Sequence, residues 1–261
     1  MAHLLIFDAL NLIRRLHAPL ASEQSDSRAQ LLATRQRLQR TVQTILEEVQ
    51  PTHAIAVFDG AAPSWRHKLY PDYKLGRSAM PIALAEGMTD LQATLWQCGV
   101  DSLLTEDEEA DDLVATLSAR LTDRQQQVTL ISTDKGFCQL LPTGIAIRDY
   151  FNRRWLDHAF VEQQFGVTAH QLVDFWALTG ISGSHIPGVN GIGPKSAQTL
   201  LQRHGSLAAL LTAPPEGDKL LTKVQQSRDA ALLAQTLVRL RQDIPLGFNL
   251  RAIRYPPCQP A

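Results

Sequence analysis

Residues 3–15 read HLLIFDALNLIRR, and this stretch decides the fold class of the chain. Its first five residues, His3 to Phe7, form an apolar run that is typical of a buried strand, and Asp8 ends that run. Because Asp8 interrupts the apolar stretch and no small-residue cleavage site follows, we interpret the run as a first strand and not as a signal peptide.

Four more strand runs follow, and helical patterns separate them. The runs are His53–Phe58, Ser102–Leu104, Val128–Ile131 and Ile145–Ile147, with helices predicted at about residues 27–49 and 110–121. The runs are apolar on both faces, as strands are when helices cover both sides of a parallel sheet. Residues 1–155 are therefore predicted to form an α/β domain, a parallel sheet covered by helices.

The pattern changes after residue 155. Residues 156–245 read as helices only, including helices at Ser196–Arg203, Leu207–Leu211 and Arg228–Leu240. Residues 246–261 are rich in proline and are predicted to be a loosely held tail. The sequence thus predicts an α/β domain, a helical region and a short tail.

Composition excludes several classes of protein. The 261 residues are 44% hydrophobic and 20% charged, which is ordinary for a globular chain and argues against disorder or a fibrous repeat. Cys98, Cys138 and Cys258 form no CxxC pair, which argues against a disulfide framework and a zinc–thiolate site. No run approaches 18 apolar residues, so we expect no membrane span. The few, unpaired cysteines favour the reducing cytoplasm, and since nothing in the sequence indicates a stable oligomer we expect a monomer.

Acidic residues follow the predicted strands repeatedly. Asp8 and Asp59 end the first two strands, residues 105–112 carry six acids, and Asp134 follows the fourth strand. Each acid alone is typical of a turn or a helix N-cap. Sites in open parallel sheets form at the carboxyl ends of strands, however, and hard divalent cations relieve repulsion between converging carboxylates. The sequence therefore predicts a divalent metal site at this edge.

Helical spacing ranks the acids at the start of the predicted helix. Asp111 falls on the flank of an apolar stripe that includes Leu113, Val114 and Leu117, whereas Asp112 falls nearly opposite it. Asp111 is therefore expected to face inward over the strand ends. Glu109 precedes the helix, and its side chain can also turn inward.

A basic and aromatic stretch lies between the second and third strands. Its cations and aromatic residues are Arg66, Lys68, Lys74 and Arg77, interleaved with Trp65, Tyr70 and Tyr73. Such a mixture suits a nucleic-acid strand, since cations meet phosphates and rings stack on bases. A solvated surface helix is the alternative. Arg14 and Arg15 follow Asp8 closely enough to reach a phosphate near the predicted metal site.

Residues 186–197 read IPGVNGIGPKSA and form the sharpest motif of the chain. Gly191 and Gly193 allow close approach of the backbone, and Pro194 suits the first position of a helix. The amide groups at that helix start, with Lys195, would bind a DNA phosphate without reading sequence. The residues expected to contact DNA here are Gly191, Ile192, Gly193, Pro194, Lys195 and Ser196.

Taken together, these motifs resemble the 5′-nuclease or flap endonuclease family, and most closely its short bacterial members. The landmarks are residues 7–15, 57–59, 70–77, 109–112, 132–135 and 186–197. The resemblance implies a PIN-like sheet domain with a helical arch at about residues 61–88, followed by a helix–hairpin–helix region. It also implies an Mg²⁺-dependent enzyme that hydrolyses phosphodiester bonds where a 5′ flap meets duplex DNA, in replication or repair.

The resemblance also assigns residues to roles. The implied metal carboxylates are Asp8, Asp59, Glu109, Asp111, Asp112 and Asp134, and the implied phosphate contacts are Arg15 and Lys74. DNA contacts in the arch are expected from Arg66, Lys68, Tyr73 and Arg77. A K⁺ ion is implied beside the main chain of Leu178, Thr179, Pro187, Val189 and Ile192.

The chain departs from the longer members of the family at three positions. Gly136, Ile181 and Ser184 stand where those members have further acids, all belonging to a second metal site. We therefore expect one divalent ion held directly, with Asp111 as its ligand, and any second ion held through waters and the substrate phosphate.

Two other functions remain open from the sequence. The three lost acids are compatible with a weak or inactive DNA-binding protein that kept the hairpin. A PIN-like ribonuclease would share the acids at the strand ends, but such proteins lack the motif at residues 186–197.

Overall fold

The computed structural model describes residues 1–23, 26–60, 62–215 and 217–255. A six-stranded sheet with the order β3-β2-β1-β4-β5-β6 lies at the centre of the first half. Its strands are β1 (His3–Asp8), β2 (His53–Val57), β3 (Asp101–Leu103), β4 (Gln127–Ile131), β5 (Ala146–Asp149) and β6 (Arg154–Trp155). All neighbouring strands are parallel except β5 and β6, so the carboxyl ends of β1 to β4 meet at one edge.

Alternation of side chains along β1 divides the interior into two cores. Leu4 and Ile6 pack in one cluster with Leu113 of the helix after β3, and Leu5 and Phe7 pack in the other. All four side chains are fully buried, because helices cover both faces of the sheet. The predicted α/β layering is confirmed.

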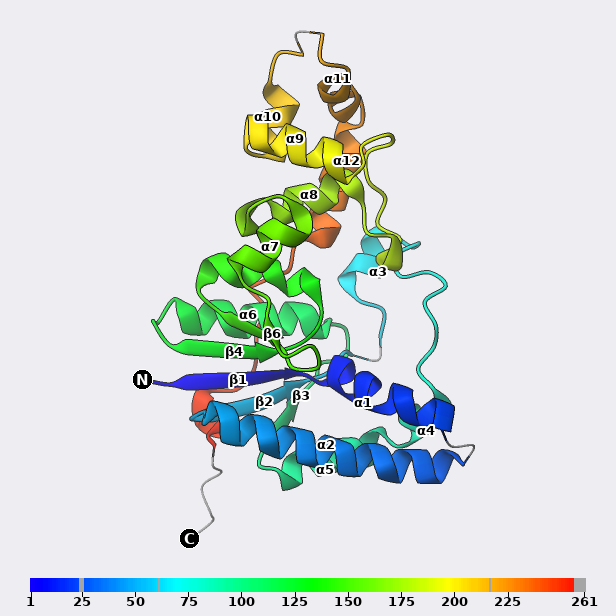
Figure 1. The fold of residues 1–261 in the computed structure, drawn as a ribbon, viewed down its shortest axis with the longest axis vertical. Coiled ribbons are helices and arrows are strands. Elements are labelled where there is room, and N and C mark those ends of the chain that lie inside the picture. The colour runs from blue at the N-terminus through cyan, green and yellow to red at the C-terminus, as the bar shows by residue number, and fades with distance from the viewer. Residues whose placement is uncertain (24–25, 61, 216, 256–261) are drawn as a thin grey trace.

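The helices of the first half lie on both sides of this sheet (Figure 1). They are α1 (Ala9–Glu23), α2 (Ser27–Val49), α3 (Trp65–Leu69), α4 (Ile82–Glu86), α5 (Met88–Gln97) and α6 (Ala110–Thr122). Helix α2 begins where the sequence predicted, because the carboxylate of Asp26 accepts a hydrogen bond from the amide of Arg28 at 3.0 Å. Helices α1, α2 and α5 pack on one face, and α6 packs on the other.

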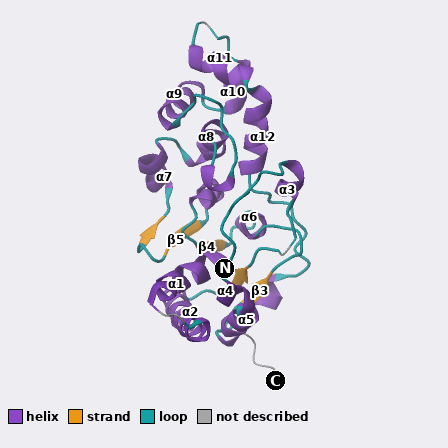
Figure 2. Ribbon diagram, turned by 90° about the vertical axis from the view of Figure 1, so that its right-hand side faces the viewer, coloured by secondary structure: helices purple, strands orange, loops and turns teal. Residues whose placement is uncertain are grey.

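Residues after β6 form a stack of helices on the α6 side of the sheet. Figure 2 shows α9 to α12 at the end of the molecule remote from α2 and α5. The helices are α7 (His158–Phe165), α8 (Leu172–Thr179), α9 (Pro194–His204), α10 (Leu207–Thr212), α11 (Lys219–Gln226) and α12 (Arg228–Val238). A nine-residue 3₁₀ helix, Lys135–Thr143, lies between β4 and β5, and shorter 3₁₀ helices lie at Ala169–Gln171, Ser182–Ser184 and Leu250–Ile253. None of the helices in the described part is long and apolar enough to cross a membrane.

Two expectations differ from the structure. The short antiparallel strand β6 was not predicted, because two residues carry no periodic signal. The prediction of a loosely held tail is wrong up to residue 255: Ile253 is buried, and the amide of Tyr255 donates to the carbonyl of Thr52 at 2.8 Å. Residues 256–261 of the predicted tail, and residue 61 of the predicted arch, lie outside the described residues.

Candidate active site

Four of the predicted acids meet at the carboxyl edge of the sheet. Asp8 ends β1, Asp59 and Asp134 follow β2 and β4, and Asp111 lies in the first turn of α6. They line one cavity of about 290 Å³, here called the acid pocket, together with Leu10, Asn11, Arg14, Arg15, Lys74 and Arg77. The parallel topology brings these acids together although more than one hundred residues separate Asp8 from Asp134.

Hydrogen bonds fix three of the four carboxylates. Asp8 accepts one from the hydroxyl of Ser132 at 2.7 Å. Asp59 accepts from the amide of Ala110 at 2.9 Å, so it also caps α6, and Asp134 accepts from the amide of Gly136 at 2.7 Å. Within the described part of the chain, the carboxylate of Asp111 accepts no hydrogen bond. Asp111 therefore has the most ligating capacity left of the four acids.

Crowding of carboxylates at this edge disfavours their charged forms. Burial, as the largest cause, and the nearby charges of Asp134 and Asp59 together raise the pKa of Asp8 to about 7, against the opposing hydrogen bond from Ser132. The pKa of Asp111 is also raised well above its usual range, first by burial and then by the charges of Asp134 and Asp8. A cation in the acid pocket would relieve this repulsion.

Four cations line the acid pocket together with these acids. They are Arg14 and Arg15 of α1, and Lys74 and Arg77 of the segment after α3. The guanidinium of Arg15 lies over the ring of Phe151, 5.9 Å from its centroid. The Nε atom of Arg14 is buried and has no hydrogen-bond partner among the residues that the structure describes. A cavity lined by both carboxylates and cations can bind a divalent ion and a phosphate together.

Glu109 does not line the acid pocket, although the resemblance assigns it to the metal. Its buried carboxylate accepts hydrogen bonds from the hydroxyls of Ser64 at 2.6 Å and Tyr73 at 3.0 Å, and from the ammonium of Lys74 at 2.7 Å. Burial opposes ionisation, but Lys74 and then Arg66 lower the pKa of Glu109 to about 2. Glu109 therefore holds Lys74 in place at the rim of the acid pocket.

Asp112 and Arg66 correct two of our expectations. Asp112 is fully buried, and its two oxygens accept bonds from the guanidinium of Arg66 at 2.7 and 2.8 Å. The indole of Trp65 and the amide of Arg241 use the remaining capacity of Asp112. Arg66 is 2% exposed and also donates to the carbonyl of Leu237. The pair joins α3, α6 and the end of α12, so Asp112 has no oxygen left for a metal in this arrangement and Arg66 is not accessible to DNA.

Of the other arch residues predicted to contact DNA, one is buried and two are exposed. Tyr73 is buried and bonded to Glu109, which contradicts its prediction as a DNA contact on the surface. Lys68 and Arg77 are exposed. Lys74 has a left-handed backbone with φ of 56°, and its amide donates to the carbonyl of Ser184 at 2.9 Å. That bond ties the arch to the helical region.

The glycine-rich motif forms the turn before α9, as expected. Gly193 is the N-cap and Pro194 begins the helix, while Lys195 is exposed. Ile192 is 4% exposed, so only its main chain can reach a ligand. The ammonium of Lys223 lies 2.8 Å from where a side chain on Gly191 would begin. No pattern in the sequence pointed to Lys223, since α11 is far from the motif along the chain.

The segments expected to bind K⁺ lie backbone to backbone. A methyl group on Gly188 would fall within 2.6 Å of main-chain atoms of Leu178, Thr179 and Gly180. The amide of Val189 donates to the carbonyl of Leu178 at 2.8 Å. Helix α8 ends there, and the carbonyls at a helix C-terminus favour a cation.

The three positions where family acids are missing lie together. Gly136, Ile181 and Ser184 line a second cavity of about 250 Å³, which shares Asp111 and Asp134 with the acid pocket. In the described part of the chain, no three His, Cys, Asp or Glu side chains are grouped closely enough to hold a metal ion between them. The acids converge without forming a closed set of protein ligands.

Comparison with known proteins agrees with this fold. Residues 3–166 match the family described as 5′-3′ exonuclease, N-terminal resolvase-like domain, and residues 167–261 match the 5′-3′ exonuclease, C-terminal SAM fold. The chain is 60% identical over 259 residues to flap endonuclease Xni of Aeromonas salmonicida, covering 98% of both chains.

Solved structures show the same fold at low identity. The T5 5′-exonuclease with bound divalent metal ions (zinc) matches with a TM-score of 0.73 and 22% identity, over 91% of this chain and 89% of that one. The T5 flap endonuclease in a pseudo-enzyme–product complex with DNA and metal ions matches with a TM-score of 0.72, also at 22% identity, 91% and 89% coverage. The chain therefore belongs to the 5′-3′ exonuclease family, alongside the bacterial flap endonucleases named Xni.

Proposed function

We propose that this chain is a flap endonuclease that hydrolyses a phosphodiester bond where a 5′ flap meets duplex DNA, with Mg²⁺ as its cofactor. The acid pocket carries this proposal, because four aspartates and four cations line a single cavity at the sheet edge. Family membership makes the chain a nuclease, and the geometry of the acid pocket supports phosphate as the group acted on.

The side chains present in the acid pocket suit Mg²⁺. Their metal-binding atoms are oxygens, and neither His nor Cys lines the cavity. We propose Asp111 as the direct ligand because, of the four aspartates in the acid pocket, it is the one whose carboxylate accepts no hydrogen bond from the described residues. Asp8, Asp59 and Asp134 would act mainly through bound waters, and a second ion would depend on waters and the substrate phosphate. When bound, Mg²⁺ would lower the pKa of a water and stabilise charge on the phosphate.

Cations of the chain would orient the phosphate. Arg15 and Lys74 line the acid pocket and are proposed to contact the phosphate that is cleaved. Lys68 and Arg77 are exposed on the arch and would contact the flap strand. Glu109 acts through Lys74, which it holds by a bond of 2.7 Å, and so it is a positioning residue.

The duplex arm would bind at the start of α9. Gly191, Gly193 and Pro194 leave the helix start open, and Lys195 and Lys223 supply cations beside it. We propose that K⁺ binds the main chain of Leu178, Thr179, Pro187, Val189 and Ile192 and rigidifies this turn. On this proposal the protein acts as a monomer in the cytoplasm, where Cys98 and Cys138 remain reduced.

A cleavage assay with a labelled 5′ flap tests this function. The natural chain should cut near the junction in Mg²⁺ and should not cut in EDTA. The same assay with RNA flaps of matched sequence distinguishes a flap endonuclease acting on DNA from a ribonuclease, since a ribonuclease would cut the RNA flap at least as fast as the DNA flap.

A DNA-binding protein without catalysis is the second candidate, and the loss of acids at Gly136, Ile181 and Ser184 favours it. It would bind the DNA flap in Ca²⁺ with the same preference for junctions but would leave the strand intact in Mg²⁺.

A further inference from the structure

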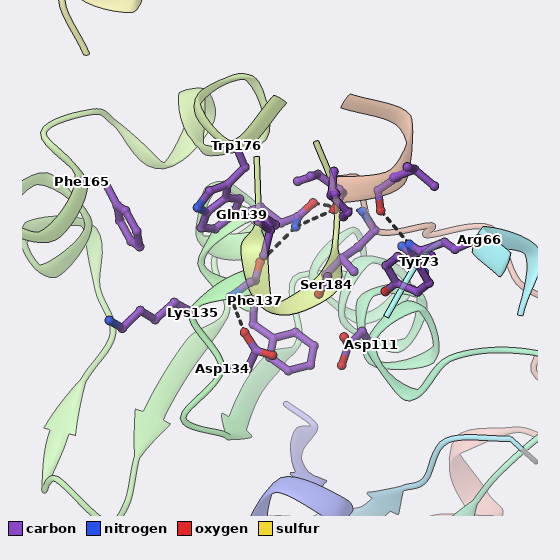
Figure 3. A pocket seen from close by; sticks show the side chains of 16 residues that line it. Arg66, Tyr73, Asp111, Asp134, Lys135, Phe137, Gln139, Phe165, Trp176 and Ser184 are labelled. Atoms are coloured by element: carbon purple, nitrogen blue, oxygen red, sulfur yellow. Dashed lines mark hydrogen bonds between the residues drawn. The ribbon is translucent and has the colours of Figure 1, made fainter. Parts of the chain in front are cut away.

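The second cavity, here called the aromatic pocket, opens beside the acid pocket. It has a volume of about 250 Å³, and Asp111 and Asp134 line both cavities. Figure 3 shows these two aspartates on one side of the aromatic pocket and Trp176 on the opposite side. If a phosphate of a nucleic-acid strand binds in the acid pocket, the sugar and base attached to that phosphate would therefore lie at the mouth of the aromatic pocket.

Aromatic rings form much of the wall. Tyr73, Phe137, Phe165 and Trp176 line the aromatic pocket, and the last two pack edge to face with ring centroids 5.5 Å apart. Phe137 is 1% exposed and Trp176 is 8% exposed, so these walls are held rigidly by the core. Flat apolar faces in a fixed arrangement favour a planar ring as ligand.

The polar groups of the aromatic pocket show where a ligand would bond. The amide of Gln139 is already used by the carbonyls of Gly136 and Val238, and the hydroxyl of Tyr73 by Glu109. In contrast, the indole N–H of Trp176 has no hydrogen-bond partner among the described residues. A ligand that offers an acceptor atom at the edge of a planar ring would satisfy this donor.

We propose that the aromatic pocket binds an unpaired nucleobase, the one adjoining the phosphate held in the acid pocket. Ring carbonyl and ring nitrogen atoms of bases are acceptors for Trp176, and every base has a face that stacks on aromatic walls. The pocket would tolerate any sequence, since stacking on aromatic side chains does not distinguish among bases. Gly136, Ile181 and Ser184 add no charge to the lining, so the acidic side chains Asp111 and Asp134 lie only on the side shared with the acid pocket. The inference rests on the proposed function, since the acid pocket must hold a phosphate.

Flap substrates that each lack one base test the proposal. Binding is measured in Ca²⁺, so the result does not depend on cleavage. Removal of the base at one position beside the junction should weaken binding by roughly 5- to 100-fold, as expected for loss of a stacked base, and removal elsewhere should change it little. Uniform binding of all these substrates would overturn the proposal, whereas failure of the natural chain to cut the intact flap would overturn only the proposed function.

Variants then link the effect to the aromatic pocket. Trp176→Phe keeps a ring but removes the donor, so it should weaken binding of the intact flap about 2- to 10-fold and hardly affect the substrate that lacks the critical base. Ser184→Leu should fill the cavity and make the two substrates bind alike. The control is Trp155→Phe on β6, where the side chain is 49% exposed. Equal effects of Trp176→Phe and Trp155→Phe, or additive effects of Trp176→Phe and base removal, would overturn the assignment.

Discussion

Asp111 and Asp112 are consecutive residues of α6, yet their carboxylates face different surroundings. Asp111 lines the acid pocket with three other aspartates, whereas Asp112 is fully buried and pairs with Arg66 at 2.7 Å. Successive residues of a helix point about 100° apart, so one turn of α6 serves both a reactive cavity and the interior. Asp111 is therefore placed for the chemistry of the site, whereas Asp112 stabilises the arch through Arg66.

Removal of Asp112 should destabilise the fold. Asp112→Ala would leave the guanidinium of Arg66 buried without its anion, and loss of one partner from such a pair costs about 3–5 kcal/mol. Chemical denaturation measures this free energy of unfolding. The control is Arg203→Ala, which breaks an exposed pair with Asp218 and should change stability by about 1 kcal/mol or less. Similar losses for both variants would contradict a structural role for Asp112.

The stability of the metal-free protein should fall as the acid pocket ionises. Folding raises the pKa of Asp8 from 3.8 to about 7, so its favourable contribution is complete below pH 4 and is lost as the pH rises through 7. From pH 4 to pH 8, the free energy of unfolding of Asp8→Asn should therefore rise by about 1–4 kcal/mol relative to that of the natural chain. Thermal unfolding in EDTA measures the difference. A difference that is the same at both pH values would show that Asp8 is not under this repulsion.

Glu109 should have the opposite pH dependence. Its pKa falls to about 2 on folding, so the stabilisation that it provides is present above about pH 4.5 and is lost as the pH falls toward 2. Glu109→Gln should narrow the difference in stability between pH 6 and pH 3. It should also slow cleavage by about ten-fold or more at neutral pH, since Lys74 loses the carboxylate that holds it.

Lys195 and Lys223 should contribute to binding of the duplex arm. Lys195→Ala and Lys223→Ala should each weaken binding for all sequences alike and make its salt dependence shallower by about one counterion. Arg124→Ala is the control, since Arg124 is exposed near the end of α6 and away from this turn. Equal losses on free single strands and on duplex substrates would refute the assignment of this motif to the duplex. Exchange of K⁺ for a smaller or larger monovalent ion should weaken duplex binding in the natural chain.

The sequence predicted the features that depend on neighbouring residues better than those that depend on contacts between distant segments. Hydrophobic runs gave the sheet, and strand-end acids gave four residues of the acid pocket, because parallel strands place their carboxyl ends at one edge. Helical spacing placed Asp111 correctly but left Asp112 facing outward, since the wheel of one helix contains no information about Arg66 and residues 237–241.

Other features depended on contacts between distant segments. Tyr73 and Arg66 of the arch were predicted to contact DNA because they lie in a basic and aromatic stretch, but both side chains are buried. Lys223 and Trp176 carried no local motif, and only the packing of α11 and α8 places them beside a turn and a cavity.

The central claim is that Asp111 holds the divalent ion on which cleavage depends. The most direct measurement is single-turnover cleavage of a labelled 5′ flap in Mg²⁺ by the natural chain, Asp111→Asn and Asp112→Asn, with binding in Ca²⁺ measured alongside. We expect Asp111→Asn to lose at least about a hundred-fold in rate, since a bound metal ion contributes several kcal/mol, and to bind the flap normally. Asp112→Asn should be less stable, but its folded fraction should still cut. Full activity of Asp111→Asn, or equal loss of cleavage in both variants at matched folded fraction, would contradict the account.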